Sequence, residues 1–346
     1  MDRRPFIKLG LLGLFAINAK LSLADEGYQF NFSQSKQGYL NRIQSFKKSG
    51  ILPIIDVESS YNPTDFDPEA FVRTMDRMGV AQSCLSLDSP RGGSTWSDAS
   101  NQLAIKFPSY FIPTGNGGIY PAWTSNPEKF LDENERNIIQ QKIPLMGEFE
   151  FRHYPSPRQV ERNATGNKTN RDVDIPIDGP LGHRLFAFSE KTGTPFQIHY
   201  EIEDGLLGLL EKMLTQYPNA KVIWCHFAQI RYSSRSSIYS PEYLGALLDK
   251  HKNLYIDTAF GGPKSIYPLS GEPHARYWAN QDAWNKLIIS KPYRFLAALD
   301  LAGDRMGMFE GSTQRLREVL NGLPEKTAET VAYKAAWKLL FNEDIA

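Results

Sequence analysis

The chain has 346 residues, 41% of them hydrophobic, and its 39 Lys and Arg side chains balance its 39 Asp and Glu side chains. A chain of this length can bury one large core, so a single domain with insertions is sufficient to account for it. The formal net charge of zero, without a basic stripe or an acidic tail, gives no reason to expect a nucleic-acid partner. A small-molecule substrate is therefore the expected partner.

Residues 1–24 are predicted to be a twin-arginine-type export signal. Arg3 and Arg4 precede a modest apolar run that ends in small residues. The run is short and contains Lys20, so we do not expect a stable membrane span. The mature chain is expected to begin near Asp25 and to act in a bacterial periplasm. A basic amphipathic start that stays attached is the alternative.

Eight apolar runs follow, with amphipathic segments between most of them. This alternation predicts an α/β fold, a single (β/α)8 TIM barrel over residues 51–346, preceded by an N-terminal extension over 25–50. A helix over 325–341 is expected to close the barrel. The predicted strands occupy 51–58, 80–87, 110–115, 143–151, 195–200, 221–227, 253–260 and 293–300.

Two long connections interrupt the pattern, after the fourth strand (154–179) and after the seventh strand (261–279). Long loops at the C-terminal end of a barrel usually shape the substrate pocket. The first connection is polar and rich in Arg, Asn and Asp. It is interpreted either as a lid over the site or as a disordered excursion.

Imidazole and carboxylate side chains lie where predicted strands end. His199 and His226 are near the ends of the fifth and sixth strands, and Asp300 ends the eighth. Side chains at the C-terminal ends of parallel barrel strands converge on one opening, where a bound cation can polarise a substrate and activate water. The pattern therefore predicts a metal site.

Four further carboxylates belong to the same end of the predicted barrel. Asp56 and Glu58 end the first strand and Glu148 and Glu150 the fourth, and each pair is spaced to point to one face. Two unit charges 4 Å apart repel by about 4 kcal/mol at an effective dielectric of 20. One or two divalent ions, zinc or manganese, would relieve that repulsion.

The alternative is a salt-bridge network without a metal. In that interpretation Arg152 and Arg231 pair with Asp56, Glu58 or Glu150. The two cysteines of the chain lie inside apolar strand runs on strands that would not be neighbours. They are therefore expected to be core residues without a disulfide.

With these residues, the chain resembles the amidohydrolase superfamily, particularly its amidohydrolase-2-like branch, over about 51–341. His199, His226 and Asp300 match that family's histidines of strands five and six and its aspartate of strand eight. The chain departs from the family at strand one, where Asp56-Val57-Glu58 replaces His-x-His. It also has Ala228 where a glycine often follows the sixth-strand histidine.

The resemblance implies a metal-dependent hydrolase of an ester, lactone or amide bond. It places Glu148 where the family has its fourth-strand or bridging ligand. The expected metal ligands are Asp56, Glu58, Glu148, His199, His226 and Asp300.

In the expected mechanism Asp300 accepts the proton of a metal-activated water, and His226 or Arg152 stabilises the oxyanion. The residues expected to contact substrate are His153, Tyr154, Arg231 and Trp123. A decarboxylase of the same superfamily and an inactive ligand-binding barrel are the alternative functions. A homo-oligomer is possible.

Overall fold

The structure is a computed structural model that describes residues 29–62, 66–87, 96–118, 122–155, 172–230, 235–263 and 276–345. The predicted export signal lies outside these residues. None of the helices in these ranges combines the length and the apolar composition needed to cross a membrane.

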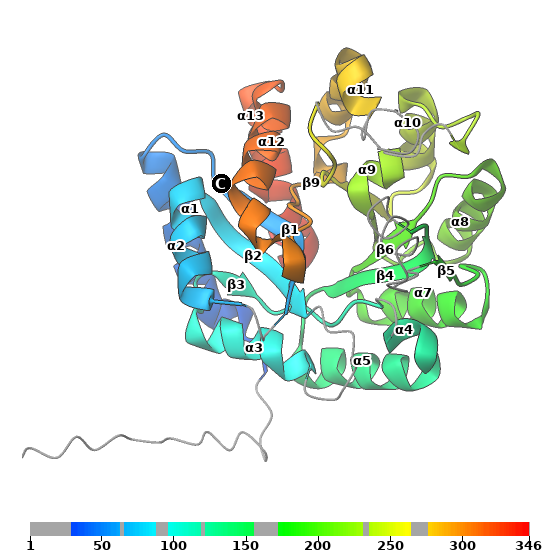
Figure 1. The fold of residues 1–346 in the computed structure, drawn as a ribbon, viewed down its shortest axis with the longest axis horizontal. Coiled ribbons are helices and arrows are strands. Elements are labelled where there is room, and N and C mark those ends of the chain that lie inside the picture. Colours follow the sequence, from blue (N-terminus) through cyan, green and yellow to red (C-terminus); the bar gives the residue numbers. More distant parts are fainter. Residues whose placement is uncertain are drawn as a thin grey trace, which may run out of the picture.

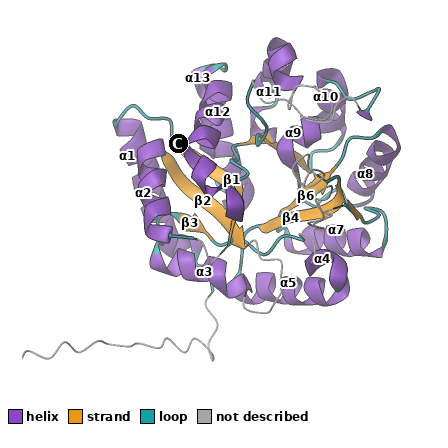
Figure 2. Ribbon diagram, viewed as in Figure 1, coloured by secondary structure: helices purple, strands orange, loops and turns teal. Residues whose placement is uncertain are grey.

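Eight parallel strands form the centre of the molecule, and each overlaps one of the eight predicted runs. Helices surround them, which gives a TIM barrel (Figures 1 and 2). The fold class predicted from the sequence is confirmed. The strands are β1 (Ile54–Tyr61), β2 (Val80–Leu87), β3 (Phe111–Ile112), β4 (Met146–His153), β6 (Phe196–Tyr200), β7 (Val222–Trp224), β8 (Leu254–Asp257) and β9 (Phe295–Leu296).

The strands belong to two sheets, with the orders β1-β2-β3 and β5-β4-β6-β7-β8-β9. Backbone hydrogen bonds connect the sheets at both seams: Gly147 N donates to Gly115 O (3.0 Å), and Asp300 N donates to Glu58 O (2.9 Å). The first seam needs glycine, because a Cβ on Gly147 would lie 2.9 Å from Gly117 N. The second seam brings the ends of strands one and eight together.

One short strand was not predicted. β5 (Val173–Asp174) pairs antiparallel with the end of β4. It lies within the connection 154–179, so the end of that connection is ordered against the sheet. Residues 156–171 of the same connection, which carry the lid prediction, lie outside the described residues.

The helices start and end at residues that favour helix boundaries. In α2, the Asp67 carboxylate accepts hydrogen bonds from the first-turn N–H groups of Glu69 and Ala70, and Gly79 ends the helix at φ 73°. The α-helices are α1 (Phe32–Lys48), α2 (Pro68–Met78), α3 (Trp96–Lys106), α4 (Ala122–Ser125), α5 (Pro127–Gln141), α7 (Pro180–Thr192), α8 (Asp204–Gln216), α10 (Pro241–Lys250), α11 (Gln281–Ser290), α12 (Phe309–Asn321), α13 (Glu325–Glu329) and α14 (Ala335–Phe341). The short segment α9 (Cys225–Gln229) is a turn with left-handed backbone.

The predicted N-terminal extension contains α1, which packs on the last helix. The Phe32 ring stacks on Phe341 of α14 with 3.9 Å between centroids. Tyr39 of α1 is buried and its hydroxyl donates to the carbonyl of Phe111 (2.8 Å). The predicted closing helix over 325–341 is interrupted, because the π-helix η5 (Thr330–Lys334) separates α13 from α14.

The barrel interior is closely packed below the opening. Every residue of β1 and β2 is buried. The Gln197 side chain crosses the interior and donates to the carbonyl of Val57 (2.9 Å). This packed interior gives the titratable groups above it a rigid base.

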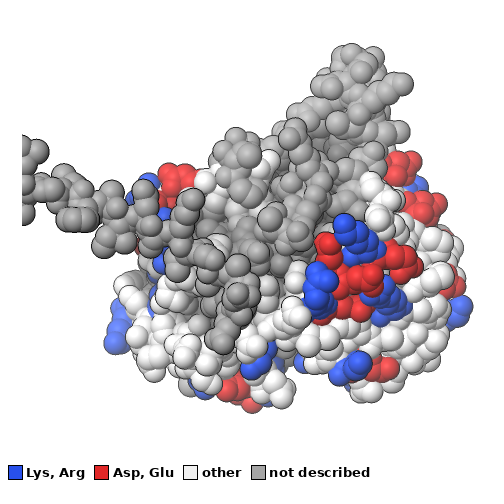
Figure 3. Space-filling view, turned by 90° about the horizontal axis from the view of Figure 1, so that it is seen from below, with Lys and Arg blue, Asp and Glu red and all other residues white. Residues whose placement is uncertain are grey.

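On the outer surface in Figure 3, the described acidic and basic side chains are interspersed, as the balanced charge of the chain leads one to expect.

Candidate metal centre

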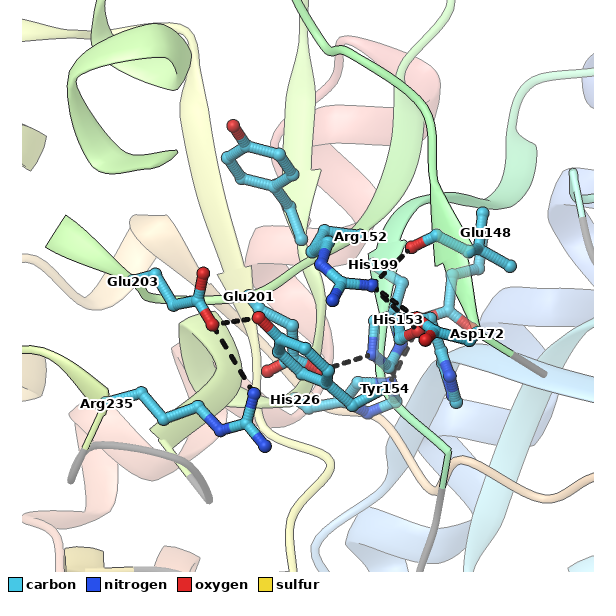
Figure 4. A network of polar contacts seen from close by, with 12 residues as sticks. Glu148, Arg152, His153, Tyr154, Asp172, His199, Glu201, Glu203, His226 and Arg235 are labelled. Atoms are coloured by element: carbon cyan, nitrogen blue, oxygen red, sulfur yellow. Dashed lines mark hydrogen bonds and ion pairs between the residues drawn. The ribbon is translucent and has the colours of Figure 1, made fainter. Parts of the chain in front are cut away.

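Three side chains converge on one point: Glu148 from the first half of β4, His199 from near the end of β6 and His226 from just after β7 (Figure 4). Glu148 Oε1 lies 2.9 Å from His199 Nδ1 and 2.9 Å from His226 Nε2. The two ring nitrogens are 3.2 Å apart. The three donor atoms come from neighbouring parallel strands, so the sheet itself sets their spacing. These are three of the residues that the sequence predicted as ligands.

The backbone is left-handed where His226 leaves the sheet. Four successive non-glycine residues, His226 to Gln229, have φ of 58°, 54°, 53° and 59°. Left-handed backbone costs about 1–2 kcal/mol for each such residue. Strain of this kind persists only where the surroundings enforce it, and it is concentrated at functional sites.

Specific contacts hold this left-handed turn. Asp257 Oδ1 accepts the His226 N–H (2.8 Å), and the Tyr239 hydroxyl donates to the carbonyl of Phe227 (2.8 Å). The Phe227 ring is enclosed by the aromatic rings of Phe260, Tyr277, Trp284 and Phe295. The turn allows the His226 ring to contact Glu148. Ala228, which stands where the family often has a glycine, lies within this left-handed turn.

Glu58 and Asp300 lie next to this group, Glu58 near the His226 nitrogen that faces Glu148 and Asp300 near the other ring nitrogen. Glu58 Oε1 is 3.7 Å from His226 Nε2, and Asp300 Oδ2 is 3.7 Å from His226 Nδ1. The exposed fraction is 24% for the Asp300 side chain, 6% for Glu58 and 4% for His226. Asp300 is thus the most solvent-accessible of the three.

Asp56 has a different environment from the one expected of a ligand. Its carboxylate is buried and accepts four hydrogen bonds, from the Ser59 and Ser83 hydroxyls (2.7 and 2.8 Å) and from the backbone N–H groups of Leu299 and Glu58 (3.0 and 3.2 Å). A register shift in β1 between Asp56 and Ser59 accompanies this arrangement. Asp56 therefore joins strands one, two and eight.

The electrostatics of the carboxylates differ. Burial raises the pKa of Glu58 well above its usual value, and the negative charges of Asp257, Asp300 and Glu148 raise it further. Burial also acts to raise the pKa of Glu148, but the imidazoles of His226 and His199 outweigh burial and lower it. One cluster thus contains an acid that resists ionisation beside one that ionises readily.

The donor set fits a divalent cation. Imidazole nitrogen and carboxylate oxygen are ligands of zinc and of manganese, and three donors that leave a position open are typical of a catalytic zinc. Glu58 Oε2 is buried and, among the described residues, has no hydrogen-bond partner. A cation beside Glu58 would satisfy that oxygen.

Arg152 does not take part in the predicted salt-bridge network. Its Nη1 binds Asp172 (2.6 Å) and the carbonyl of Val173 (2.9 Å), and its guanidinium stacks on the Tyr154 ring at 3.8 Å (Figure 4). β5 supplies that carbonyl, which sequence reasoning did not anticipate. The contacts give no support to the predicted role of Arg152 at an oxyanion. Arg231 lies outside the described residues.

The predicted substrate contacts have different locations. The His153 ring packs against His199 with 4.2 Å between centroids, beside the centre. Tyr154 lies between the guanidinium groups of Arg152 and Arg235, and its hydroxyl donates to Glu203.

The prediction for Trp123 is wrong. Its side chain is fully buried, its Nε1 donates to the carbonyl of Glu150 (2.8 Å), and it packs on Phe149 and Phe151. It is a core residue and cannot reach a substrate, because its ring packs on β4, the next strand along the chain.

Glu201 was missed from the sequence. Its carboxylate is buried and its Oε1 lies 3.2 Å from His199 Nε2, opposite the nitrogen that faces Glu148. The signal was present, since Glu201 follows His199 by two positions and so shares its face. A carboxylate on the second ring nitrogen fixes the tautomer and orientation of a metal-binding histidine.

Comparison with known proteins agrees with this geometry. The family model described as Amidohydrolase matches residues 57–302, and the chain belongs to this family. The family and the fold define an enzyme of the amidohydrolase type. No curated protein matches the chain.

Solved structures share the fold at low identity. A crystal structure of 2,6-dihydroxybenzoate decarboxylase complexed with 2,6-dihydroxybenzoate has a TM-score of 0.52 and 12% identity, and the match covers 84% of this chain and 99% of that one. An amidohydrolase from Burkholderia multivorans with bound HEPES has a TM-score of 0.50 and 11% identity, covering 83% and 99%. A mutant of organophosphorus hydrolase has a TM-score of 0.50 and 11% identity, covering 84% and 93%.

Proposed function

We propose that the protein is a metal-dependent hydrolase of an ester, lactone or amide bond in a small molecule. The observation that carries the proposal is the convergence of Glu148 Oε1, His199 Nδ1 and His226 Nε2 within 3.2 Å of one another. A divalent ion held by these donors would supply Lewis acidity and lower the pKa of a nearby water. The membership of the amidohydrolase family supports the same chemistry.

Asp300 is the proposed general base. It is the most exposed of the acids that contact His226, so water and substrate can reach it. Its Oδ2 lies 3.7 Å from His226 Nδ1, which places a proton acceptor at the edge of the centre. After accepting the proton from water, Asp300 can pass it to the leaving group.

The remaining residues position and shield the centre. Glu201 holds the His199 ring from the side away from Glu148. The His153 ring covers the His199 ring and excludes water from that side. The exposed fraction of the His199 side chain is 2%, so the reaction takes place at the edge of the group where Asp300 is accessible.

Decarboxylation is the second candidate, because a decarboxylase is among the proteins with this fold. Arg152 or Arg231 binding a substrate carboxylate would favour a lyase acting on an aromatic acid. Arg152 is engaged with Asp172 and Tyr154, and Arg231 lies outside the described residues. We therefore place hydrolysis first.

The test combines metal analysis with product analysis. Purified protein is expected to hold at least one equivalent of zinc or manganese and to hydrolyse members of an ester, lactone and amide panel in ¹⁸O-labelled water. Hydrolysis places ¹⁸O in the product acid, whereas decarboxylation releases carbon dioxide without it. Asp300→Asn should lower kcat by about 10²–10⁴-fold, while the metal held by Glu148, His199 and His226 should remain bound.

The exposed Glu242→Gln removes one carboxylate outside the centre and serves as the matched control. A metal-free protein that is inactive on the panel yet binds a ligand tightly would overturn the proposal in favour of a binding protein.

A further inference from the structure

Below the candidate metal centre lies a second cluster of ligand-type side chains, formed by Glu58, Cys225 and Asp257. One carboxylate oxygen of each acid and the thiol sulfur lie within 4.8 Å of one another. All three residues are buried. They come from β1, the end of β7 and the end of β8, so the barrel strands bring them together.

Both carboxylates of this cluster have an oxygen without a partner. Asp257 Oδ1 accepts the N–H groups of His226 and Ala259, at 2.8 and 3.0 Å. Asp257 Oδ2 and Glu58 Oε2 are buried and have no hydrogen-bond partner in the described part of the chain. A buried polar atom without a partner costs about 1–3 kcal/mol, and more when it is charged.

The neighbours described for these two acids do not neutralise them. Glu58 has His226 as its ion-pair partner at 3.7 Å. Asp257 accepts hydrogen bonds from two neutral backbone N–H groups and also interacts with the Cys225 thiol. A cation between the two acids would bind the buried, unpartnered oxygen of each. The adjacent sulfur suits this role, because thiolate is a strong ligand for borderline-soft metals.

We propose that Glu58, Cys225 and Asp257 form a second metal position, with one sulfur and two carboxylate oxygens as donors. This set suits zinc or cobalt(II) better than magnesium or calcium, which take oxygen ligands. When the metal binds, the thiol proton leaves to solvent and a sulfur–metal bond forms. The inference deepens the proposed function and rests on it for the supply of a divalent metal.

The two positions share Glu58. Its Oε1 faces His226, and its carboxylate also belongs to the cluster with Cys225. Loss of Glu58 should therefore weaken metal binding at both positions, whereas loss of Cys225 should affect only the lower one.

The test uses cobalt(II) as the probe and absorption as the readout, without reliance on activity. The full chain, stripped of metal, is titrated with cobalt(II). We expect a sulfur-to-cobalt charge-transfer band in the near ultraviolet. Cys225→Ser should abolish the band and remove one equivalent of bound cobalt, while the cobalt bound through Glu148 and the histidines remains.

Cys84→Ser is the matched control, because Cys84 is the other cysteine of the chain and is equally buried. It should keep the band. With only two cysteines present, a band that survives in Cys84→Ser assigns the sulfur to Cys225 even if Cys225→Ser does not fold.

The outcomes separate the two proposals. Cobalt bound without a charge-transfer band would overturn the second position and leave the hydrolase proposal standing. A protein that binds no cobalt at all would count against both. Asp257→Asn should shift the band or weaken the affinity about 10-fold or more, and an unchanged titration would exclude Asp257 as a ligand.

Discussion

Strands β1 and β4 each place a carboxylate inside the barrel, Asp56 and Glu148, but different groups contact the two carboxylates. The Asp56 carboxylate accepts four hydrogen bonds from serine hydroxyls and backbone N–H groups. Glu148 Oε1 instead faces two imidazole nitrogens. Backbone N–H groups can only donate, and the two serine hydroxyls donate to Asp56 here, whereas a neutral imidazole can present a lone pair to a metal.

The difference shows that burial does not by itself identify a metal ligand. Asp56 is more deeply buried than Glu148, yet its acceptor sites are already occupied. A ligand needs partners that can be displaced or that also bind the metal. Of the two acids on strand one, Asp56 is held by four hydrogen bonds, whereas Glu58 lies beside His226.

The largest expected effect is on stability at Asp56. Burial raises the pKa of Asp56 from its usual 3.8 to about 7, so the folded chain binds this proton more tightly than the unfolded chain. The resulting stabilisation is present below pH about 4 and is lost as the pH rises to about 7, up to about 4 kcal/mol. Asp56→Asn cannot ionise and should lose less stability over that interval. Urea unfolding at several pH values measures both chains.

Glu242→Gln provides the reference for that experiment and should follow the wild type. Parallel stability curves for wild type and Asp56→Asn would show that Asp56 does not titrate in this interval. Asp56→Asn should also keep its metal, which separates a scaffold acid from a ligand.

Glu148→Gln should have the next largest effect. Mutation of a residue that only orients a metal ligand lowers metal affinity by about 10–100-fold. Glu148 contacts both histidines directly, so its loss should lower metal affinity by at least about 100-fold. Competition with a chelator of known affinity measures it. Asp56→Asn is the matched control, because it replaces another acid inside the barrel by its amide. If the two variants retain metal equally, the distinction between the two regions is wrong.

Glu201→Gln should weaken metal binding by about 10–100-fold without removing a ligand. Its Oε1 lies 3.2 Å from His199 Nε2, so the change alters the hydrogen bond that orients the ring. The same competition assay applies, and Glu201→Asp should recover part of the affinity if orientation is the cause. Equal losses in both variants would point to packing instead.

Ala228→Gly is the smallest change. Ala228 has a φ of 53°, which glycine adopts without strain, so the variant should gain about 0.5–1 kcal/mol of stability. Lys142→Gly is the control, since Lys142 is exposed and has the same φ of 53° at the end of α5. Both should raise the stability, but only Ala228→Gly should alter metal affinity. A destabilised Ala228→Gly would show that its methyl group is needed in the core.

Much of the fold could be predicted, because strand and helix patterns are local. All eight barrel strands overlap predicted runs. The positions of His199 and His226 near strand ends predicted that the two rings would lie close together, and their nitrogens are 3.2 Å apart. β5 could not be predicted, since a strand of two residues has no period to detect.

The site was less predictable, because its details depend on contacts that are distant in sequence. Arg152 binds Asp172, a partner in a polar loop that shows no pattern. Asp56 and Glu58 have the spacing of two ligands, but a register shift and two serines change what Asp56 contacts. The left-handed turn after β7 depends on Asp257 and Tyr239, which no local propensity reveals.

The pairing of α1 with α14 has a consequence for the order in which the chain folds. Phe32 stacks on Phe341, and Lys36 forms an ion pair with Glu343 across 307 positions of sequence. On the ribosome, α1 emerges long before the helix that covers its aromatic face. Its docking is therefore among the last steps of folding, slowed by the large loop it closes, and ribosome-bound chains lacking α14 should be sensitive to proteolysis within α1.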